Sequence, residues 1–142
     1  MAEEAKKFSG KWQLTTTDAN FDKYMTLLGV SYLLRKIGNK VKPLMTITVS
    51  EDGQTFNITS VSTFKTVVVD FRLGEPFEQT TPDGRVMKTT FTIEEGKLVE
   101  RQEKINDKDK DNVLVREVKD KELITTCTCE DVSCVRVYVK QD

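Results

Sequence analysis

An arginine and a tyrosine near the end of the chain carry the chemistry that is hardest to interpret. They stand two apart in the alternating stretch CVRVYVK, residues 134–140. Side chains two apart in a strand share a face, so Arg136 and Tyr138 point together either into the protein or into solvent. Directed inward, a guanidinium and a phenol would offer hydrogen-bond donors suited to a carboxylate. The alternation leaves both orientations open, because valines occupy the other face.

Other reactive residue types are scarce. The chain has no histidine, which excludes Ser-His-Asp and Cys-His nucleophilic sites and histidine-ligated metals. Its glycines stand singly at turns, so no phosphate-binding loop is predicted. Cys127, Cys129 and Cys134 are too few for a structural zinc site, and their odd number favours reduced thiols. A disulfide between Cys129 and Cys134 across a hairpin is geometrically conceivable. We expect no catalytic residue set, no metal and no cofactor.

Composition narrows the class of protein. The 142 residues have 37% hydrophobic content and a formal charge of -1, which predicts one globular domain over residues 1–142 without affinity for nucleic acid. The start, MAEEAKKFSGKW, lacks the apolar run of a signal peptide, and nowhere do about eighteen apolar residues follow one another. The expected location is cytoplasmic.

The elements that must position these residues are mostly strands. Short β-favouring runs alternate with turn signals such as Asp52-Gly53 and Asp83-Gly84, which predicts an all-β meander. A sheet of so many strands is expected to curl or close. The runs are LMTITVS, TFNITSV, FKTVVVDF, RVMKTTFTI, KLVERQ, NVLVRE, LITTCTC and CVRVYVK, after a first strand that precedes residue 20.

Residues 20–41 depart from this pattern. Apolar residues recur at helical spacing in FDKYMTLL, between a candidate N-cap, Asn20, and Gly29. A second short helix is predicted to begin after Ser31 and to end at Gly38, with Pro43 preventing its continuation.

The order and spacing of several segments resemble the intracellular fatty-acid-binding proteins of the calycin group. The segments are FSGKWQLTTTDANFDKYMTLLGV, RKIGNKVKP, STFKTVVVDFRLGEPFEQTTPDGR and the terminal CVRVY, and the match covers about residues 8–138. The resemblance implies a ten-stranded antiparallel β-clam, or barrel, with a helix-turn-helix lid over an internal ligand cavity. It also implies a monomeric, non-enzymatic carrier.

The resemblance further implies where the polar residues lie. It puts Arg136 and Tyr138 inside the barrel, with Arg116 as a second internal arginine, so that the three would hold a lipid carboxylate. An enclosed arginine needs a partner, because leaving its charge uncompensated is costly. The alternative is that either arginine is exposed or pairs with a glutamate such as Glu100 or Glu117.

Other positions match residues that line or rim the family's cavity, although apolar residues at helical spacing such as Phe21 and Met25 are equally consistent with packing of a lid on a barrel. Phe64, in a turn, is the best candidate for the portal. The matched positions are Phe21, Tyr24, Met25, Leu34, Pro43, Met45, Ser60, Ser62, Phe64, Asp83, Arg85, Gln102 and Cys127.

These features predict a carrier of a long-chain fatty acid. The alternatives are a carrier of retinoic acid, another retinoid or a sterol, and an enzyme that acts on a lipid through Cys127, for which no base is evident. Transient contact with anionic membranes is also predicted, because four cations lie on and just after the second predicted helix. These cations are Arg35, Lys36, Lys40 and Lys42.

Overall fold

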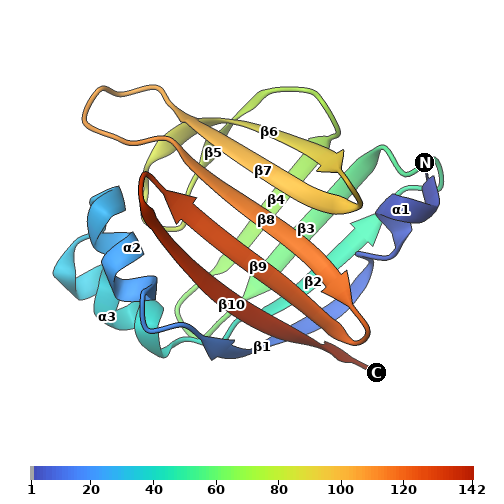
Figure 1. The fold of residues 1–142 in the computed structure, drawn as a ribbon, viewed down its shortest axis with the longest axis horizontal. Helices are drawn as coiled ribbons and strands as arrows, with labels where there is room; N and C mark the ends of the chain where they lie inside the picture. Colours follow the sequence, from blue (N-terminus) through green and yellow to red (C-terminus); the bar gives the residue numbers. More distant parts are fainter. Residues whose placement is uncertain (1) are drawn as a thin grey trace.

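The computed structural model describes residues 2–142, which form one curled antiparallel sheet with helices at its two ends (Figure 1). The helices of this described part are α1 (Ala2–Lys6), α2 (Phe21–Leu28) and α3 (Tyr32–Lys40). Its strands are β1 (Gly10–Thr17), β2 (Leu44–Val49), β3 (Thr55–Val61), β4 (Thr66–Arg72), β5 (Phe77–Thr80), β6 (Val86–Glu94), β7 (Lys97–Lys104), β8 (Asn112–Lys119), β9 (Glu122–Cys129) and β10 (Val132–Gln141).

The first strand pairs with the last, which curls the sheet into a nearly closed barrel. Neighbouring strands follow the order β4-β3-β2-β1-β10-β9-β8-β7-β6-β5, so β4 and β5 are the two edges. Phe71 on β4 and Phe91 on β6 stack with their ring centroids 3.6 Å apart, which joins the two sides of this gap. The expected β-clam with a helical lid is therefore confirmed. The short strand β5 was not among the runs predicted from the sequence.

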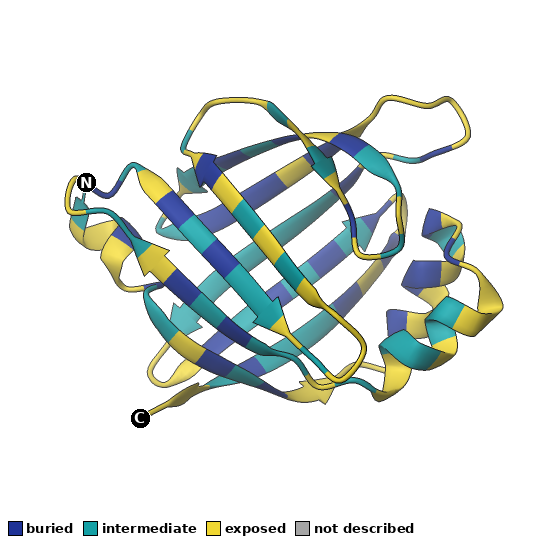
Figure 2. Cartoon of the chain, turned by 180° about the vertical axis from the view of Figure 1, so that it is seen from behind, coloured by how far each residue is buried: buried dark blue, intermediate teal, exposed yellow. Residues whose placement is uncertain are grey.

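The end of the barrel away from the lid is filled by apolar side chains. Ala5, Phe8 and Trp12 are fully buried, and Trp12 Nε1 donates a hydrogen bond to the Phe8 carbonyl oxygen at 2.9 Å. Helix α1 lies at this end (Figure 1). The sequence analysis missed α1, because a five-residue helix presents too few apolar positions for a periodic pattern. Buried residues alternate with intermediate or exposed ones along several strands, such as β6 and β9 (Figure 2).

The lid helices begin and end for identifiable reasons. Gly29 terminates α2 in the left-handed conformation, with φ of 92°, and the Ser31 side chain caps α3 by accepting from the Leu34 N–H. Asn20 occupies the N-cap position of α2 as predicted, but its side chain donates to the Ser133 carbonyl instead of capping the helix. No helix among residues 2–142 has the length and apolar character needed to cross a membrane.

The predicted end of the second helix at Gly38 is wrong. Helix α3 continues to Lys40, and Gly38 lies inside it, where an added Cβ would stand 3.0 Å from the Met25 sulfur. Gly38 is therefore a position of close helix packing. The two helices are also joined through Asp22, which accepts from Arg35 Nε at 3.3 Å and from Asn39 Nδ2 at 3.0 Å.

Candidate functional site

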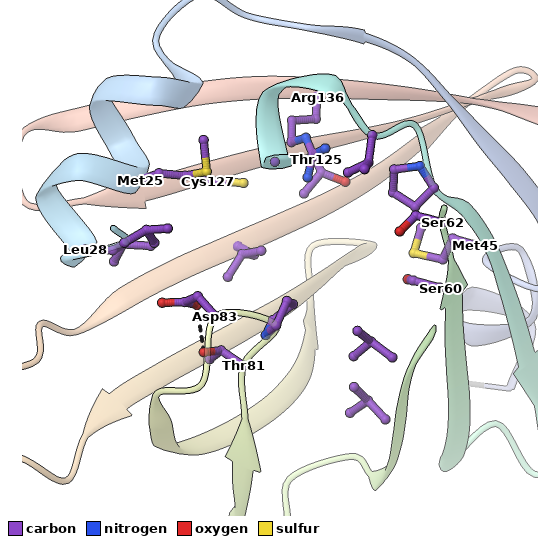
Figure 3. A pocket seen from close by; sticks show the side chains of 18 of the residues that line it. Met25, Leu28, Met45, Ser60, Ser62, Thr81, Asp83, Thr125, Cys127 and Arg136 are labelled. Carbon is purple, nitrogen blue, oxygen red and sulfur yellow. Dashed lines mark hydrogen bonds between the residues drawn. The ribbon is translucent and has the colours of Figure 1, made fainter. Parts of the chain in front are cut away.

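A cavity of about 300 Å³ lies in the barrel beneath the lid helices (Figure 3). Every residue that the sequence analysis proposed for the head-group site, the cavity or the portal lines it. Arg136 and Tyr138 therefore point inward, which settles the orientation that the alternating pattern left open. Phe64, in the turn between β3 and β4, is 45% exposed and lies at the rim of the cavity.

Strand register brings the internal polar residues of β8, β9 and β10 into one row. Arg116 on β8 pairs with Thr125 on β9, and Thr125 pairs with Arg136 on β10. Thr17 on β1 continues the row beyond Arg136. Directly opposite residues on one face are neighbours, so the row sets two guanidinium groups on either side of one hydroxyl.

Arg136 lies beneath the lid. Its guanidinium carbon is 4.2 Å from the centroid of the Phe21 ring of α2, and its Nε is 3.5 Å from Thr17 Oγ1. Within residues 2–142 no carboxylate forms an ion pair with Arg136. The cavity therefore contains a half-buried cation that an aromatic face satisfies only in part.

Arg116 is paired, as one alternative from the sequence analysis anticipated. Its Nη1 donates to Glu100 Oε1 at 2.9 Å, and the two side chains are only 11% and 3% exposed. Gln102 Nε2 donates to the other Glu100 oxygen at 2.6 Å, and Asn112 Nδ2 donates to Gln102 Oε1 at 3.1 Å. Tyr24 of the lid adds a longer bond to Asn112, at 3.3 Å. The network connects Arg116 to α2.

A second ion pair lies at the rim of the cavity near the turn between β5 and β6. Arg85 donates from Nε and Nη2 to the two oxygens of Asp83, at 2.7 and 2.9 Å, and Thr81 Oγ1 donates to Asp83 at 2.8 Å. Burial tends to raise the pKa of Asp83, but the hydrogen bonds and charge of Arg85 outweigh it and lower that pKa.

The cysteines lie differently from the pairing considered in the sequence analysis. Cys134 lies opposite Cys127 in the ladder, and Cys129 lies opposite Val132, so a bond between Cys129 and Cys134 is not favoured by the register. The three thiols are buried, and none of these described cysteines forms a disulfide. A hydrogen bond with Cys134 lowers the pKa of the Cys127 thiol, burial opposes this, and the charges of Arg136 and Arg116 add to the lowering.

Several polar residues that line the cavity were not proposed as binding residues from the sequence, among them Gln79, Thr81, Glu100 and Thr125. Glu100 was considered only as a partner for an arginine, and Thr125 was not considered. Glu100 and Thr125 could have been found from the alternation of side-chain direction along a strand. Glu100 is two residues before Gln102 and Thr125 is two before Cys127, and Gln102 and Cys127 had been expected to face the cavity. Among residues 2–142 no group of three His, Cys, Asp or Glu side chains could hold a metal ion.

Comparison with known proteins is consistent with this geometry. Fatty acid-binding protein homolog 5 of Caenorhabditis elegans is 40% identical over 137 residues, which cover 96% of this chain and 98% of that one. The structure of a Schistosoma mansoni fatty acid binding protein in complex with arachidonic acid is similar with a TM-score of 0.90, at 36% identity over 98% of this chain and 99% of that one. Lipid binding protein 8 of Caenorhabditis elegans also gives a TM-score of 0.90, at 32% identity over 96% of each chain.

The family assignment follows from the whole length of the barrel. Residues 9–141 match the model of the lipocalin / cytosolic fatty-acid binding protein family, from the start of β1 to the end of β10. The ten-stranded sheet, the helical lid and the internal cavity agree with that match across residues 2–142. The chain belongs to the lipocalin / cytosolic fatty-acid binding protein family.

Proposed function

We propose that this protein is a non-enzymatic carrier of one long-chain fatty acid, held in the barrel with its carboxylate at Arg136. The main observation behind the proposal is that Arg136 faces the cavity and has no carboxylate partner among the described residues. A half-buried guanidinium without a counter-ion is stabilised by a ligand that supplies one. The planar guanidinium matches a carboxylate through two parallel hydrogen bonds.

Tyr138 and Arg116 complete the proposed head-group site. The Tyr138 hydroxyl is a donor that adds no charge, and the residue is on the same strand and face as Arg136. Arg116 shares its charge with Glu100, so it contributes through the nitrogen atoms that Glu100 does not engage. This division makes Arg136 the main electrostatic partner of the ligand.

The acyl chain is proposed to lie against the apolar part of the wall beneath the lid. This part includes Met25 and Leu28 of α2, Met45 of β2 and Ile58 of β3, with Phe64 at the rim. Burial of a long alkyl chain contributes about 0.8 kcal/mol per methylene group. The cavity therefore suits a ligand with one anionic end and a long apolar remainder.

Carriage without turnover is supported by the lack of an evident base for the Cys127 thiol. Cys127 lies opposite Cys134 in the ladder, and the chain contains no histidine that could take up the thiol proton. We place the carrier in the cytoplasm, in keeping with the family's description as cytosolic, and expect it to be a monomer. Delivery is proposed to involve contact of α3 with anionic membranes.

The membrane-contact proposal rests on three of the four predicted cations. Lys36, Lys40 and Lys42 are exposed, whereas Arg35 is engaged by Asp22 and donates from Nη1 to the Val30 carbonyl oxygen at 2.8 Å. Arg35 therefore stabilises the lid. Tyr32 and Leu33, 65% and 69% exposed, add apolar side chains at the start of α3.

The carrier function is tested by identifying and titrating the ligand. Native mass spectrometry of the purified protein should show a one-to-one complex whose added mass is that of a fatty acid. The delipidated protein should then bind oleic acid more tightly than oleyl alcohol or all-trans-retinol, because only the acid supplies a charge to Arg136. Tighter binding of retinol, or of a sterol, would overturn the assignment to fatty acids.

A further inference from the structure

Thr125 lies between the two internal arginines of the barrel. On its two sides in the ladder are Arg116 of β8 and Arg136 of β10, and all three residues line the cavity. Figure 3 shows Thr125 beside Arg136 on the cavity wall. The residue thus occupies the centre of the proposed head-group site.

The Thr125 hydroxyl is buried with its hydrogen-bonding capacity unused. The residue is only 4% exposed, and its Oγ1 has no hydrogen-bond partner in the part of the chain that the structure describes. Buried polar atoms are normally satisfied, since an unsatisfied one is destabilising. A threonine in this position therefore needs a partner that the protein alone does not provide.

Arg116 presents a second unused donor in the same row. Its Nη1 is turned to Glu100, while its Nε is buried and has no partner among residues 2–142. Two neighbouring donors, Arg116 Nε and Thr125 Oγ1, are thus available to one acceptor group. A carboxylate has two oxygens and about four lone-pair sites, so it can accept from both while it also pairs with Arg136.

We propose that Thr125 is a specificity-determining residue of the lipid site, its hydroxyl donating a hydrogen bond to the ligand carboxylate between Arg116 and Arg136. This inference rests on the proposed fatty-acid carrier function and adds a donor from β9 to the arginine and tyrosine of β10. The Thr125 hydroxyl orients the ligand, because its hydrogen bond holds one carboxylate oxygen between Arg116 and Arg136. The guanidinium of Arg136 supplies the charge.

Three variants test the inference. Thr125→Val keeps the shape of the side chain and removes the hydroxyl, Thr125→Ser keeps the hydroxyl, and Thr126→Val makes the same change on the next residue, which points to the other face of β9. Oleic acid and methyl oleate are titrated into each delipidated protein, and urea unfolding is followed in parallel.

Thr125→Val should weaken oleic acid binding about tenfold to a hundredfold, the size expected for one hydrogen bond to a charged group. Thr125→Ser and Thr126→Val should stay within about threefold of the parent, a margin well below that loss. Delipidated Thr125→Val should unfold at the same urea concentration as the parent or a higher one, because an unsatisfied buried hydroxyl has been removed. Methyl oleate, a weaker acceptor without charge, should be much less affected.

The outcomes separate this inference from the carrier function. Unchanged oleic acid binding in Thr125→Val, combined with weak binding in Arg136→Leu, would overturn the role of Thr125 and leave the carrier function standing. Equal weakening of oleic acid and methyl oleate would mean that the cavity changed shape, which would also overturn the role. A parent protein that binds no oleic acid would overturn the carrier function itself.

Discussion

Glu100 and Arg116 form an ion pair inside the barrel, with Arg116 Nη1 donating to Glu100 Oε1 at 2.9 Å. The pair bridges β7 and β8 and is nearly inaccessible to solvent. The two internal arginines therefore have different roles. The charge of Arg116 is balanced by Glu100, whereas Arg136 has no carboxylate partner within residues 2–142. Arg136 therefore provides an uncompensated positive charge inside the cavity for a ligand.

Replacing Glu100 with glutamine should strengthen fatty-acid binding and weaken the fold. Loss of the internal negative charge removes repulsion of the ligand carboxylate and leaves Arg116 free to attract it, an effect on the order of tenfold in affinity. The same loss leaves a buried guanidinium without its counter-ion, which should lower the free energy of unfolding by about 3 kcal/mol. Oleic acid titration and urea unfolding measure the two effects.

Glu117→Gln is the matched control for Glu100→Gln. Glu117 pairs with Lys97 at 3.3 Å, and both side chains are partly exposed. Such a pair contributes about 0–1 kcal/mol, so affinity and stability should both remain close to the parent. Identical behaviour of the two glutamine variants would show that the Glu100–Arg116 pair has no special influence on the cavity.

Arg136→Leu should weaken oleic acid binding by about 2 to 5 kcal/mol, because the ligand carboxylate would be enclosed without its charged partner. The stability of the ligand-free protein should change little. Removing a partly desolvated charge is favourable, while loss of the stacking on Phe21, 4.2 Å away, costs about 0.5 to 2 kcal/mol. Titration and urea unfolding of the delipidated variant measure both quantities.

The control is Arg72→Leu, which removes an arginine half exposed to solvent and paired with Glu75 at 3.2 Å. It should leave oleic acid affinity unchanged. Unaltered affinity in Arg136→Leu would contradict the assignment of the head-group site to β10.

The ion pair at the rim should make stability depend on acid pH. Because the pKa of Asp83 is lowered in the folded state, its carboxylate stabilises the protein above the unfolded pKa, about 3.9. That contribution is lost as the pH falls through the lower folded pKa. At pH 7, Asp83→Asn should lower the free energy of unfolding by about 1 to 3 kcal/mol, since it weakens hydrogen bonds to a charged partner.

The difference between the parent and Asp83→Asn should shrink as the pH falls below about 4, where the parent also loses the charge. Urea unfolding at a series of pH values checks this trend. Asp107→Asn, a change at an exposed loop residue, is the control and should leave the free energy of unfolding at pH 7 within about 0.5 kcal/mol of the parent. A difference that stays constant down to pH 2, far below the ordinary aspartate range, would mean that Asp83 acts through shape and not through charge.

Charge reversal on α3 should slow delivery to anionic membranes. Lys36→Glu with Lys40→Glu replaces two exposed cations, each of which contributes about 1 kcal/mol near an anionic surface. Transfer of a fluorescent fatty acid to vesicles of acidic phospholipid should slow on the order of tenfold and lose its dependence on salt. Lys119→Glu at the end of β8 combined with Lys121→Glu in the turn before β9 is the control. Equal rates in both double variants would exclude direct contact through α3.

The local elements could be predicted from sequence because their causes are local. The β-favouring run at residues 55–61 predicted β3 with the bounds that the structure has, and Gly29 and Ser31 marked the junction between the lid helices as observed. Short elements were missed: α1 and β5 contain five and four residues, too few for a periodic pattern to emerge. The family resemblance, carried by segments along the chain, identified the nearly closed barrel.

The orientation of Arg136 and Tyr138 was not determined by the alternation of CVRVYVK, because a barrel with an internal cavity does not require its inward residues to be apolar. Only the tertiary structure decided which arginine is compensated. Cross-strand register brings Glu100 to Arg116 from sixteen residues away, and it sets Thr125 between Arg116 and Arg136. Sequence alone specified which side chains could bind a carboxylate. Pairing between distant strands decided which of these side chains have no partner in the protein and remain free to bind a ligand. The physical reason is that the partner of each side chain depends on contacts between strands, which no local sequence pattern encodes.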